Sequence, residues 1–550
     1  MTRFTWLATL MAVAGFALGA CGGKDGGGKT IEKAEEGTFL RVLRADTSPI
    51  LDPHATDSGG NANVIQQMYE GLVKPSRKQP VTWEPCLAES WLHDEEHKVW
   101  TFVIRQGVKF HDGTELDANV VKRSFDRIII EDDPAQPIER PYRVDYFGFI
   151  KDVQAPDANT VVITLKTPRP NFIVSLGLFS GTVISSKALE HMATISDPKA
   201  RSAWLTSHSA GTGPFRVAKP SDFVDGATVT LTAFEDYWGG APKLERVVLT
   251  SSDQVKRRRE QIAAGATDVT TDLDCADWAD LREDTGVTLY TWDAENLCYL
   301  ALNCSPDCKH PTNDVRVRKA IAMAIDRGPI VETYSGAAVP HHVLLPPVTM
   351  GHPKGYKPST DVGDRSERLA KARELVKAAG AEGAELPLWF PAVPRPYLLR
   401  PDAIADHIRQ HLKEIGLNVT LHKREMKELT PDRASLNFAM TLIGWMGETG
   451  EPDNFWRPLL SGSNGKPAGQ NHAHFYNAEV EKKVNDALYE LDKDERVQRY
   501  EALEKWVHEE FRPMVPLLSS DQSVAWRSNV KGVYVDSTGT YRLHEAYFEK

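Results

Sequence analysis

The sequence predicts an α/β protein, because short strand-like runs are separated by segments with helical periodicity. The chain has 550 residues, of which 41% are hydrophobic and 26% charged, as is typical of globular proteins. A chain of this length can bury sizeable cores without disulfide cross-links. Its formal net charge of −11 argues against binding to nucleic acid, which requires a basic surface.

The first elements follow from local periodicity. Residues 40–44 alternate in polarity and predict a strand, and a helix is expected over residues 63–73, where apolar residues recur every four positions. Asp117 is suited to cap a helix over residues 117–128. The rest of the chain alternates between the two types. Strands are expected over residues 100–104, 160–165, 228–233, 246–250, 298–302, 387–390, 418–422 and 439–443, and helices over 255–264, 315–326, 367–379, 401–415 and 480–510.

Residues 1–20 predict a secretory signal. Arg3 precedes an apolar run over residues 4–18, which is too short to span ~30 Å of hydrocarbon as a helix. The run ends in L-G-A-C, which resembles the lipobox of bacterial lipoproteins, cut before Cys21 and lipidated on its thiol; the alternative is an ordinary signal followed by a chance cysteine. Glycine-rich residues predict a flexible tether over 21–39. We therefore expect an exported protein, lipid-anchored to a membrane of the cell envelope.

Export also permits disulfide bonds. An odd number of cysteines follows Cys21, which implies at least one free thiol or a non-local partner. The spacing of Cys304 and Cys308 would allow a small closed loop, but C-x3-C without a second pair does not predict zinc. The cysteines beyond the signal are Cys86, Cys275, Cys298, Cys304 and Cys308.

Eight short motifs follow one another in a fixed order. They are P-C-L-A-E-S-W at 85–91, T-F-V-I-R-Q-G-V-K-F-H-D-G-T at 101–114, G-T-G-P-F at 211–215, Y-W at 237–238, D-V-R-V-R-K-A-I at 314–321, A-I-D-R at 324–327, L-L-P-P at 344–347 and G-W at 444–445. In this order they resemble the extracellular solute-binding proteins of the dipeptide/oligopeptide/nickel class, family 5, which serve ABC importers. The segments L-P-L-W at 386–389, R-P-Y at 395–397 and G-W-M-G-E at 444–448 are most similar to those of dipeptide-binding lipoproteins.

The resemblance implies a two-lobed fold of the periplasmic-binding-protein type (type II, with three domains) and a ligand cleft between the lobes. Lobe 1 is expected to combine residues 40–69, 209–293 and 521–550, with an extra domain over 70–208 packed on it. Lobe 2 is expected over residues 294–520. The resemblance also implies a monomer that captures short peptides and delivers them to the permease subunits, with no cofactor and no chemistry on the ligand.

By the same resemblance, Arg395 binds the carboxylate of the peptide and Glu448 its ammonium group. The family usually has Asp at the second position, and the extra methylene of Glu448 moves the carboxylate by ~1.5 Å. Gly444, Trp445 and Met446 are expected beside the ligand, where a strand ends at the carboxyl edge of the sheet. The loop Asp57-Ser58-Gly59 is expected opposite, on lobe 1.

The chemistry of such a site suits a zwitterion. Enclosing a peptide removes two charged termini from water, which is costly unless each charge is paired. Arginine suits the carboxylate because its planar fork makes two parallel hydrogen bonds. Plainer alternatives remain: Glu448 as a solvated loop acid, Arg395 as a structural ion-pair partner and Trp445 as a core residue. Trp389 and Tyr397 are expected to be packing residues.

Other cargoes and functions stay open at this stage. The same fold would suit a metal chelate, haem, an opine or a sugar, and a secreted hydrolase or metalloenzyme is a third possibility. His472 and His474 are two residues apart, so both could bind one metal ion from the same face of a strand, yet no third ligand is apparent. No nucleophile, zincin or phosphate-loop motif occurs in the sequence, so we expect a binding protein without a metal, not an enzyme.

Overall fold

The computed structural model describes residues 39–56, 58–79, 81–129, 146–426, 428–429, 437–462 and 469–550. By its contacts the chain divides into two units, Met1–Glu35 and Glu36–Lys550, and every described residue belongs to the second. The predicted signal segment, Cys21 and Asp57 lie outside the described residues, as does all of the predicted tether except Phe39. None of the described helices has the length and hydrophobicity needed to cross a bilayer.

The described residues form one 13-stranded sheet with two halves that share strand β19 (Met514–Arg527). The first half consists of β1 (Phe39–Arg44), β8 (Phe215–Arg216), β9 (Phe223–Val224), β10 (Thr228–Ala233), β11 (Arg246–Ser251), β12 (Val269–Thr271) and β13 (Val287–Asp293). The second half consists of β14 (Asn296–Leu302), β15 (Ala338–Pro340), β16 (Glu385–Pro391), β17 (Asn418–Arg424) and β18 (Met440–Met446). Both halves contain parallel pairs: β1 with β11 and β12, and β16 with β17 and β18.

The chain passes between the two halves at adjacent points. Residues 514–518 of β19 pair with β14, and residues 521–527 pair with β13. The connection from β13 to β14 lies beside the same part of β19, because Asp293 pairs with Asp521. We call residues 293–296 and 518–521 the lobe crossing. Two adjacent strand connections of this kind are suited to a hinge.

A separate four-stranded antiparallel sheet has the order β4-β5-β7-β6. Its strands are β4 (Ala88–His93), β5 (Val99–Ile104), β6 (Ile150–Asp157) and β7 (Thr160–Leu165). Short two-stranded ladders complete the β-structure: β2 (Val73–Pro75) with β3 (Trp83–Pro85), β20 (Val530–Lys531) with β23 (Tyr547–Phe548), and β21 (Tyr534–Val535) with β22 (Tyr541–Arg542).

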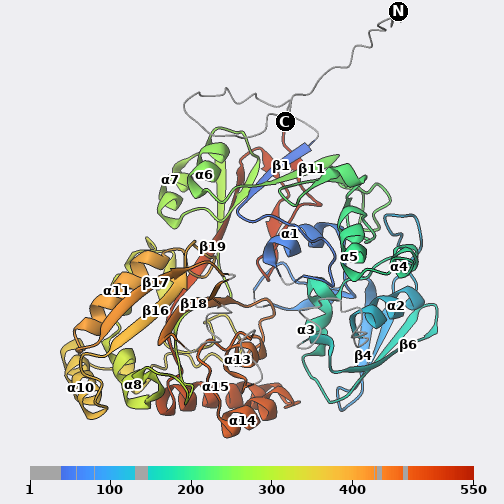
Figure 1. Ribbon diagram of the computed structural model, residues 1–550. Coiled ribbons are helices and arrows are strands. Elements are labelled where there is room, and N and C mark those ends of the chain that lie inside the picture. Colours follow the sequence, from blue (N-terminus) through green and yellow to red (C-terminus); the bar gives the residue numbers. More distant parts are fainter. Residues whose placement is uncertain are drawn as a thin grey trace, which may run out of the picture. The chain divides into compact units, whose positions relative to one another are not determined.

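Helices lie beside these sheets, as Figure 1 shows for α10 and α11 near β16 and β17. The helices of the first part are α1 (Gly59–Met68), α2 (Ala118–Ile129), α3 (Phe172–Gly177), α4 (Ser186–Ala193), α5 (Pro198–Ser207), α6 (Val255–Ala263) and α7 (Trp278–Glu283). Those of the second part are α8 (Val315–Ala324), α9 (Arg327–Glu332), α10 (Arg365–Ala378), α11 (Pro401–Lys413), α13 (Asp453–Leu460), α14 (Ala478–Leu488) and α15 (Lys493–Glu510).

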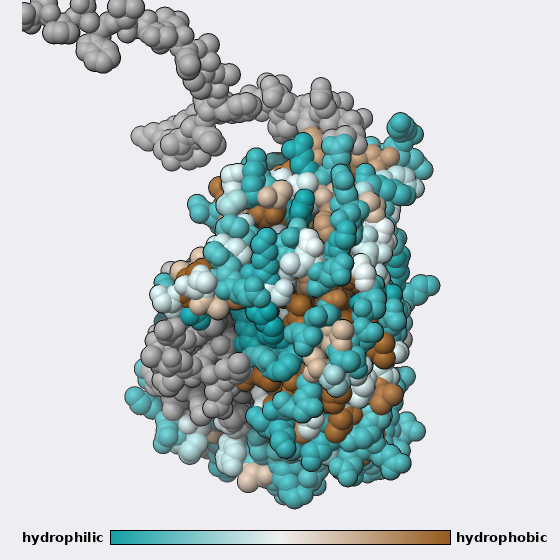
Figure 2. All heavy atoms as spheres, turned by 90° about the vertical axis from the view of Figure 1, so that its right-hand side faces the viewer, coloured by the Kyte–Doolittle hydropathy of each residue, from teal (hydrophilic) through white to brown (hydrophobic). Residues whose placement is uncertain are grey.

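Buried hydrophobic side chains form three large cores. One surrounds β14, β16 and β18, one surrounds β1, β10 and β11, and one lies on the four-stranded sheet. Hydrophilic side chains predominate on the face drawn in Figure 2, with hydrophobic ones between them. The second core also takes residues of α4 and α5, within the segment predicted as the extra domain. The domain limits expected from the sequence remain a prediction.

Most predicted elements occur with small shifts at their ends, and two predictions were wrong. The helix expected over 480–510 is two helices, α14 and α15, because the chain turns after Leu488 and Asp492 caps a new helix by accepting from the Glu495 amide. The helix expected over 63–73 begins earlier, at Gly59, and ends at Met68, so Val73 starts a strand instead. In contrast, the side chain of Asp117 accepts from the Val120 amide at 2.9 Å, as expected of an N-cap.

Candidate ligand site

Gly444, Trp445 and Met446 form the end of β18, which lies between β14 and β16. Gly444 is needed there because of a close approach: a Cβ atom at this position would lie 2.4 Å from both the carbonyl oxygen of Leu297 and Cδ2 of Tyr397. The aromatic ring of Tyr397 therefore packs directly on the strand. Successive side chains of a strand alternate, so Trp445 points to the face opposite Gly444 and Tyr397.

Arg395 lies in a tight turn two residues before Tyr397. Its amide donates to the carbonyl of Leu398 at 3.0 Å, and the Leu398 amide donates back at 2.8 Å. The lobe crossing holds the turn, since the side chain of Gln522, next to Asp521, donates to the Pro396 carbonyl at 2.9 Å. The fold thus brings the R-P-Y turn, the end of β18 and the lobe crossing together.

Two buried donors of the predicted site residues find no acceptor in the described part of the chain. Nε of Arg395 and Nε1 of Trp445 are buried without a hydrogen-bond partner among the described residues. No described ion pair involves Arg395 either, so the structural ion-pair role considered for it finds no partner there. Because buried donors are nearly always satisfied, these two atoms suit a ligand or water that offers acceptors. Their side chains are half-buried overall.

Glu448 lies in the turn that follows β18. Its side chain is half-buried, and its amide donates to Oδ1 of Asn454 at 3.2 Å. Asn454, on α13, also donates to the hydroxyl of Tyr146, which lies just before β6 of the four-stranded sheet. Gly450 also lies close to this part of the chain, since a Cβ atom at Gly450 would be 3.1 Å from Cβ of Val81. The turn after β18 therefore contacts the part of the chain predicted as the extra domain.

Ser58 and Gly59 form the start of α1. Ser58 is the N-cap residue but makes no side-chain capping bond, and its amide donates to Oγ1 of Thr56 at 3.2 Å. A Cβ at Gly59 would meet nothing within 4 Å, and both residues are exposed. Packing places Tyr397 of the R-P-Y turn on Gly444, and Glu448 follows the same strand by two residues, whereas the described contacts of Ser58 are local. The ligand-binding roles of all these residues remain a prediction.

Glu295 was not predicted as a site residue from the sequence. It precedes β14 at the lobe crossing, it is 7% exposed, and its carboxylate accepts from the amides of Thr449 and Gly450 and from the hydroxyl of Thr349. Burial raises the pKa of Glu295 to about 7, against the effect of these hydrogen bonds. An acid directly before a strand of wholly buried residues was the available signal.

The remaining candidates have structural environments. Trp389 packs with Leu429 and Phe438, which suits its expected packing role, and the side-chain amide of Asn303 donates to the Phe438 carbonyl at 3.0 Å. Cys304 and Cys308 are free thiols, so the small disulfide loop is not formed; the other cysteines of the described part, Cys86, Cys275 and Cys298, are free as well. Among the described residues no cluster of three or more His, Cys, Asp or Glu side chains is suited to a metal ion.

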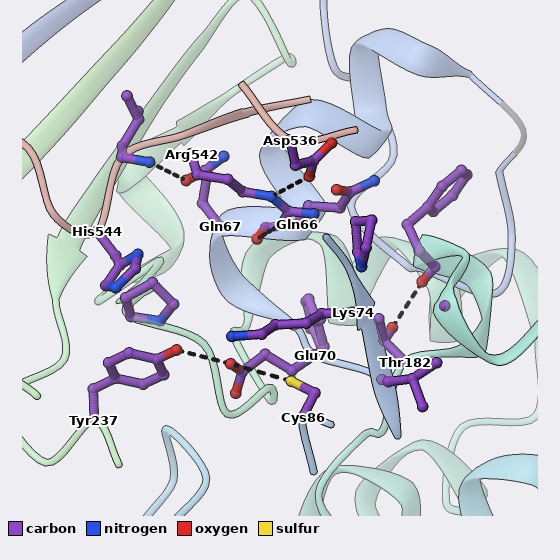
Figure 3. A pocket seen from close by; sticks show the side chains of 18 of the residues that line it. Gln66, Gln67, Glu70, Lys74, Cys86, Thr182, Tyr237, Asp536, Arg542 and His544 are labelled. Atoms are coloured by element: carbon purple, nitrogen blue, oxygen red, sulfur yellow. Dashed lines mark hydrogen bonds and ion pairs between the residues drawn. The ribbon is translucent and has the colours of Figure 1, made fainter. Parts of the chain in front are cut away.

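A partly open cavity of about 90 Å³ lies elsewhere, between α1, β2 and the C-terminal segment (Figure 3). One of its two acids, Glu70, accepts from Tyr237, Trp238 and Thr212 at 2.7–2.8 Å. Burial raises the pKa of Glu70. Because three donors already satisfy this carboxyl group, we regard it as a structural group that joins these segments.

Comparison with known proteins identifies the family. Residues 82–467 match the bacterial extracellular solute-binding proteins, family 5 (middle region). The chain belongs to this family. Family 5 proteins are extracytoplasmic binding proteins of ABC importers, and the mixed α/β architecture with two sheet halves is their two-lobed fold.

Named relatives bind different ligands. "Heme-binding protein A" of Haemophilus influenzae is 29% identical over 96% of each chain. The "Dipeptide-binding protein" of Escherichia coli is 27% identical, over 84% of this chain and 86% of its own. The solved structure of HbpA2 from Haemophilus parasuis has a TM-score of 0.77 and 27% identity, covering 93% of this chain and all of that one. These relatives are transport-associated binding proteins, not enzymes.

Proposed function

We propose that this protein captures short peptides, dipeptides or oligopeptides, between its two lobes and delivers them to the permease subunits of an ABC importer. The observation that carries the proposal is the buried Nε of Arg395, which has no partner among the described residues and belongs to the turn whose Tyr397 packs on the end of β18. A guanidinium held there is suited to the carboxylate of a peptide, which offers two parallel acceptors. Arg395 would then bind the C-terminus of the peptide.

Glu448 would bind the ammonium group at the other end. It follows β18 by two residues, so it lies next to the strand end whose backbone can pair with an extended peptide. Trp445 and Met446 would flank the peptide, and Gly444 would leave room for Tyr397. Pairing both termini offsets the cost of removing two charges from water, and a single missing partner would leave one of them buried and unpaired.

Closure of the lobes would complete the site. Asp57, Ser58 and Gly59 would face lobe 2 from the start of α1, and movement would occur at the lobe crossing. A ligand that touches both lobes stabilises the closed state by its difference in affinity for the two states. We expect the protein to act as a monomer, with lipid on Cys21 holding it to a membrane of the cell envelope.

Haem is the second candidate ligand, because a 29% identical relative is named for binding it. Its propionate groups would also suit Arg395. Titration with haem separates the two, since binding in a protein pocket shifts the main haem absorption band. A band shift with one equivalent of haem, and no binding of any peptide, would replace the peptide proposal.

Mass spectrometry of what co-purifies with the protein, followed by calorimetric titration, tests the proposal directly. We expect di- to pentapeptides to bind, and Glu448→Gln and Arg395→Ala each to weaken binding tenfold or more, which is ~1.4 kcal/mol. Matched controls are Glu385→Gln and Arg373→Ala, at exposed positions of the same lobe. Unchanged peptide affinity in both site variants would refute these assignments.

A further inference from the structure

Glu295 makes hydrogen bonds to the turn that carries Glu448, on both sides of that residue. Its Oε2 accepts from the amides of Thr449 at 3.2 Å and Gly450 at 2.9 Å, and its backbone carbonyl accepts from the amide of Gly447 at 2.5 Å. One buried residue therefore binds the chain immediately before and immediately after Glu448. Residues 447–450 are called the acid turn below.

The contact between Glu295 and the acid turn is close. A Cβ at Gly447 would lie 2.4 Å from Cδ of Glu295, so no other residue fits there without a shift. Oε1 of Glu295 accepts from the hydroxyl of Thr349 at 3.0 Å, which fixes the orientation of the carboxylate. Every oxygen of Glu295 thus has a partner, and three of its four hydrogen bonds go to the backbone of the acid turn.

We infer that Glu295 is a positioning residue for Glu448: it fixes the acid turn so that the Glu448 carboxylate is held ready for the ammonium group of the ligand. The inference rests on the proposed role of Glu448. A preformed turn avoids the cost of ordering the loop when the ligand binds. Glu295 acts through the acid turn, to whose backbone three of its four hydrogen bonds go.

Three substitutions at Glu295 separate its hydrogen bonds from its charge. Glu295→Gln keeps the whole pattern, since an amide oxygen can replace Oε2 and the amide nitrogen can donate to the Thr349 oxygen. Glu295→Ala leaves two backbone amides and a hydroxyl unsatisfied. Glu295→Asp is a milder change that withdraws the carboxylate by ~1.5 Å, beyond hydrogen-bond reach of these donors. Glu504→Ala is the control, a buried acid of the same lobe that accepts from the Leu344 amide.

The readout is the ratio of affinities for Ala-Ala and N-acetyl-Ala-Ala, measured by titration calorimetry on the full chain, with the melting temperature measured in parallel. We expect Glu295→Ala and Glu295→Asp to lower the affinity for Ala-Ala about tenfold and to leave that for N-acetyl-Ala-Ala unchanged. Glu295→Gln should keep the wild-type ratio within about threefold. Glu504→Ala should lower the melting temperature without changing the ratio.

Each alternative outcome has a distinct meaning. An unchanged ratio in folded Glu295→Asp, or an equal loss for both ligands, would overturn the positioning role and leave the proposed function intact. A wild-type protein that binds Ala-Ala and its acetylated form equally well would overturn the role of Glu448, and the role of Glu295 with it. If Glu295→Ala does not fold, the aspartate and glutamine variants still decide the question.

Discussion

Replacing Arg395 by methionine should weaken peptide binding without weakening the fold. Methionine keeps an unbranched apolar stem but removes the guanidinium. A hydrogen bond to a charged group contributes about 1.5–3 kcal/mol, so losing the carboxylate partner should reduce affinity roughly 10- to 150-fold. The loss should be specific to peptides with a free C-terminus, and amidated peptides should bind both proteins alike.

The effect on stability should be opposite or absent. Arg395 makes no described ion pair, and its buried Nε has no partner among the described residues; a buried donor in that state costs about 1–3 kcal/mol. Methionine removes this cost while its stem replaces most of the lost packing. We therefore expect the free energy of unfolding of the ligand-free protein to stay the same or rise by up to ~1 kcal/mol.

Calorimetric titration with a free and an amidated dipeptide, combined with thermal unfolding without ligand, measures both effects. The melting temperature should change by less than about 2 °C, because a chain of this length has a large unfolding entropy. Arg373→Met is the matched control, since the Arg373 side chain is exposed and donates to the Glu414 carbonyl. A clear drop in stability with unchanged peptide affinity would refute the reasoning and make Arg395 a structural residue.

Three further predictions concern stability. Glu295→Gln should become more stable relative to wild type as the pH rises. The pKa of Glu295 is raised from 4.5 to about 7 in the folded protein, so the stabilising contribution of the protonated carboxyl group is complete below pH 4.5 and is lost as the pH rises through 7. The loss is ~3 kcal/mol at most, and melting curves of both proteins from pH 5 to 8 would show it. Asp361→Ala should lower the free energy of unfolding by about 3–5 kcal/mol in denaturant titrations, because it leaves the fully buried guanidinium of Arg512 without its carboxylate 2.6 Å away; a loss below 1 kcal/mol would contradict this. Gly444→Ala should cost about 1–3 kcal/mol and weaken peptide binding, because its Cβ overlaps Tyr397, whereas Gly59→Ala, which meets no atom within 4 Å, should not reduce stability in the same melting assay.

The sequence motif alone cannot predict how the side chain of Glu448 is oriented. A motif places an acid after the strand, but the orientation of that acid depends on the acid turn. The turn is held by Glu295, which is more than 150 residues away in sequence at the other side of the sheet ladder. No pattern within the motif could indicate this partner.

By itself the sequence determined the α/β alternation, the strand over 228–233 and the helix cap at Asp117, because these depend on local periodicity and on hydrogen bonds between near neighbours. Its ordered motifs also determined the family. Only the tertiary structure decided that the R-P-Y turn meets the end of β18, since Tyr397, in the connection between β16 and α11, packs on Gly444. It also revealed Glu295, because burial and long-range hydrogen bonds form only when the chain has folded.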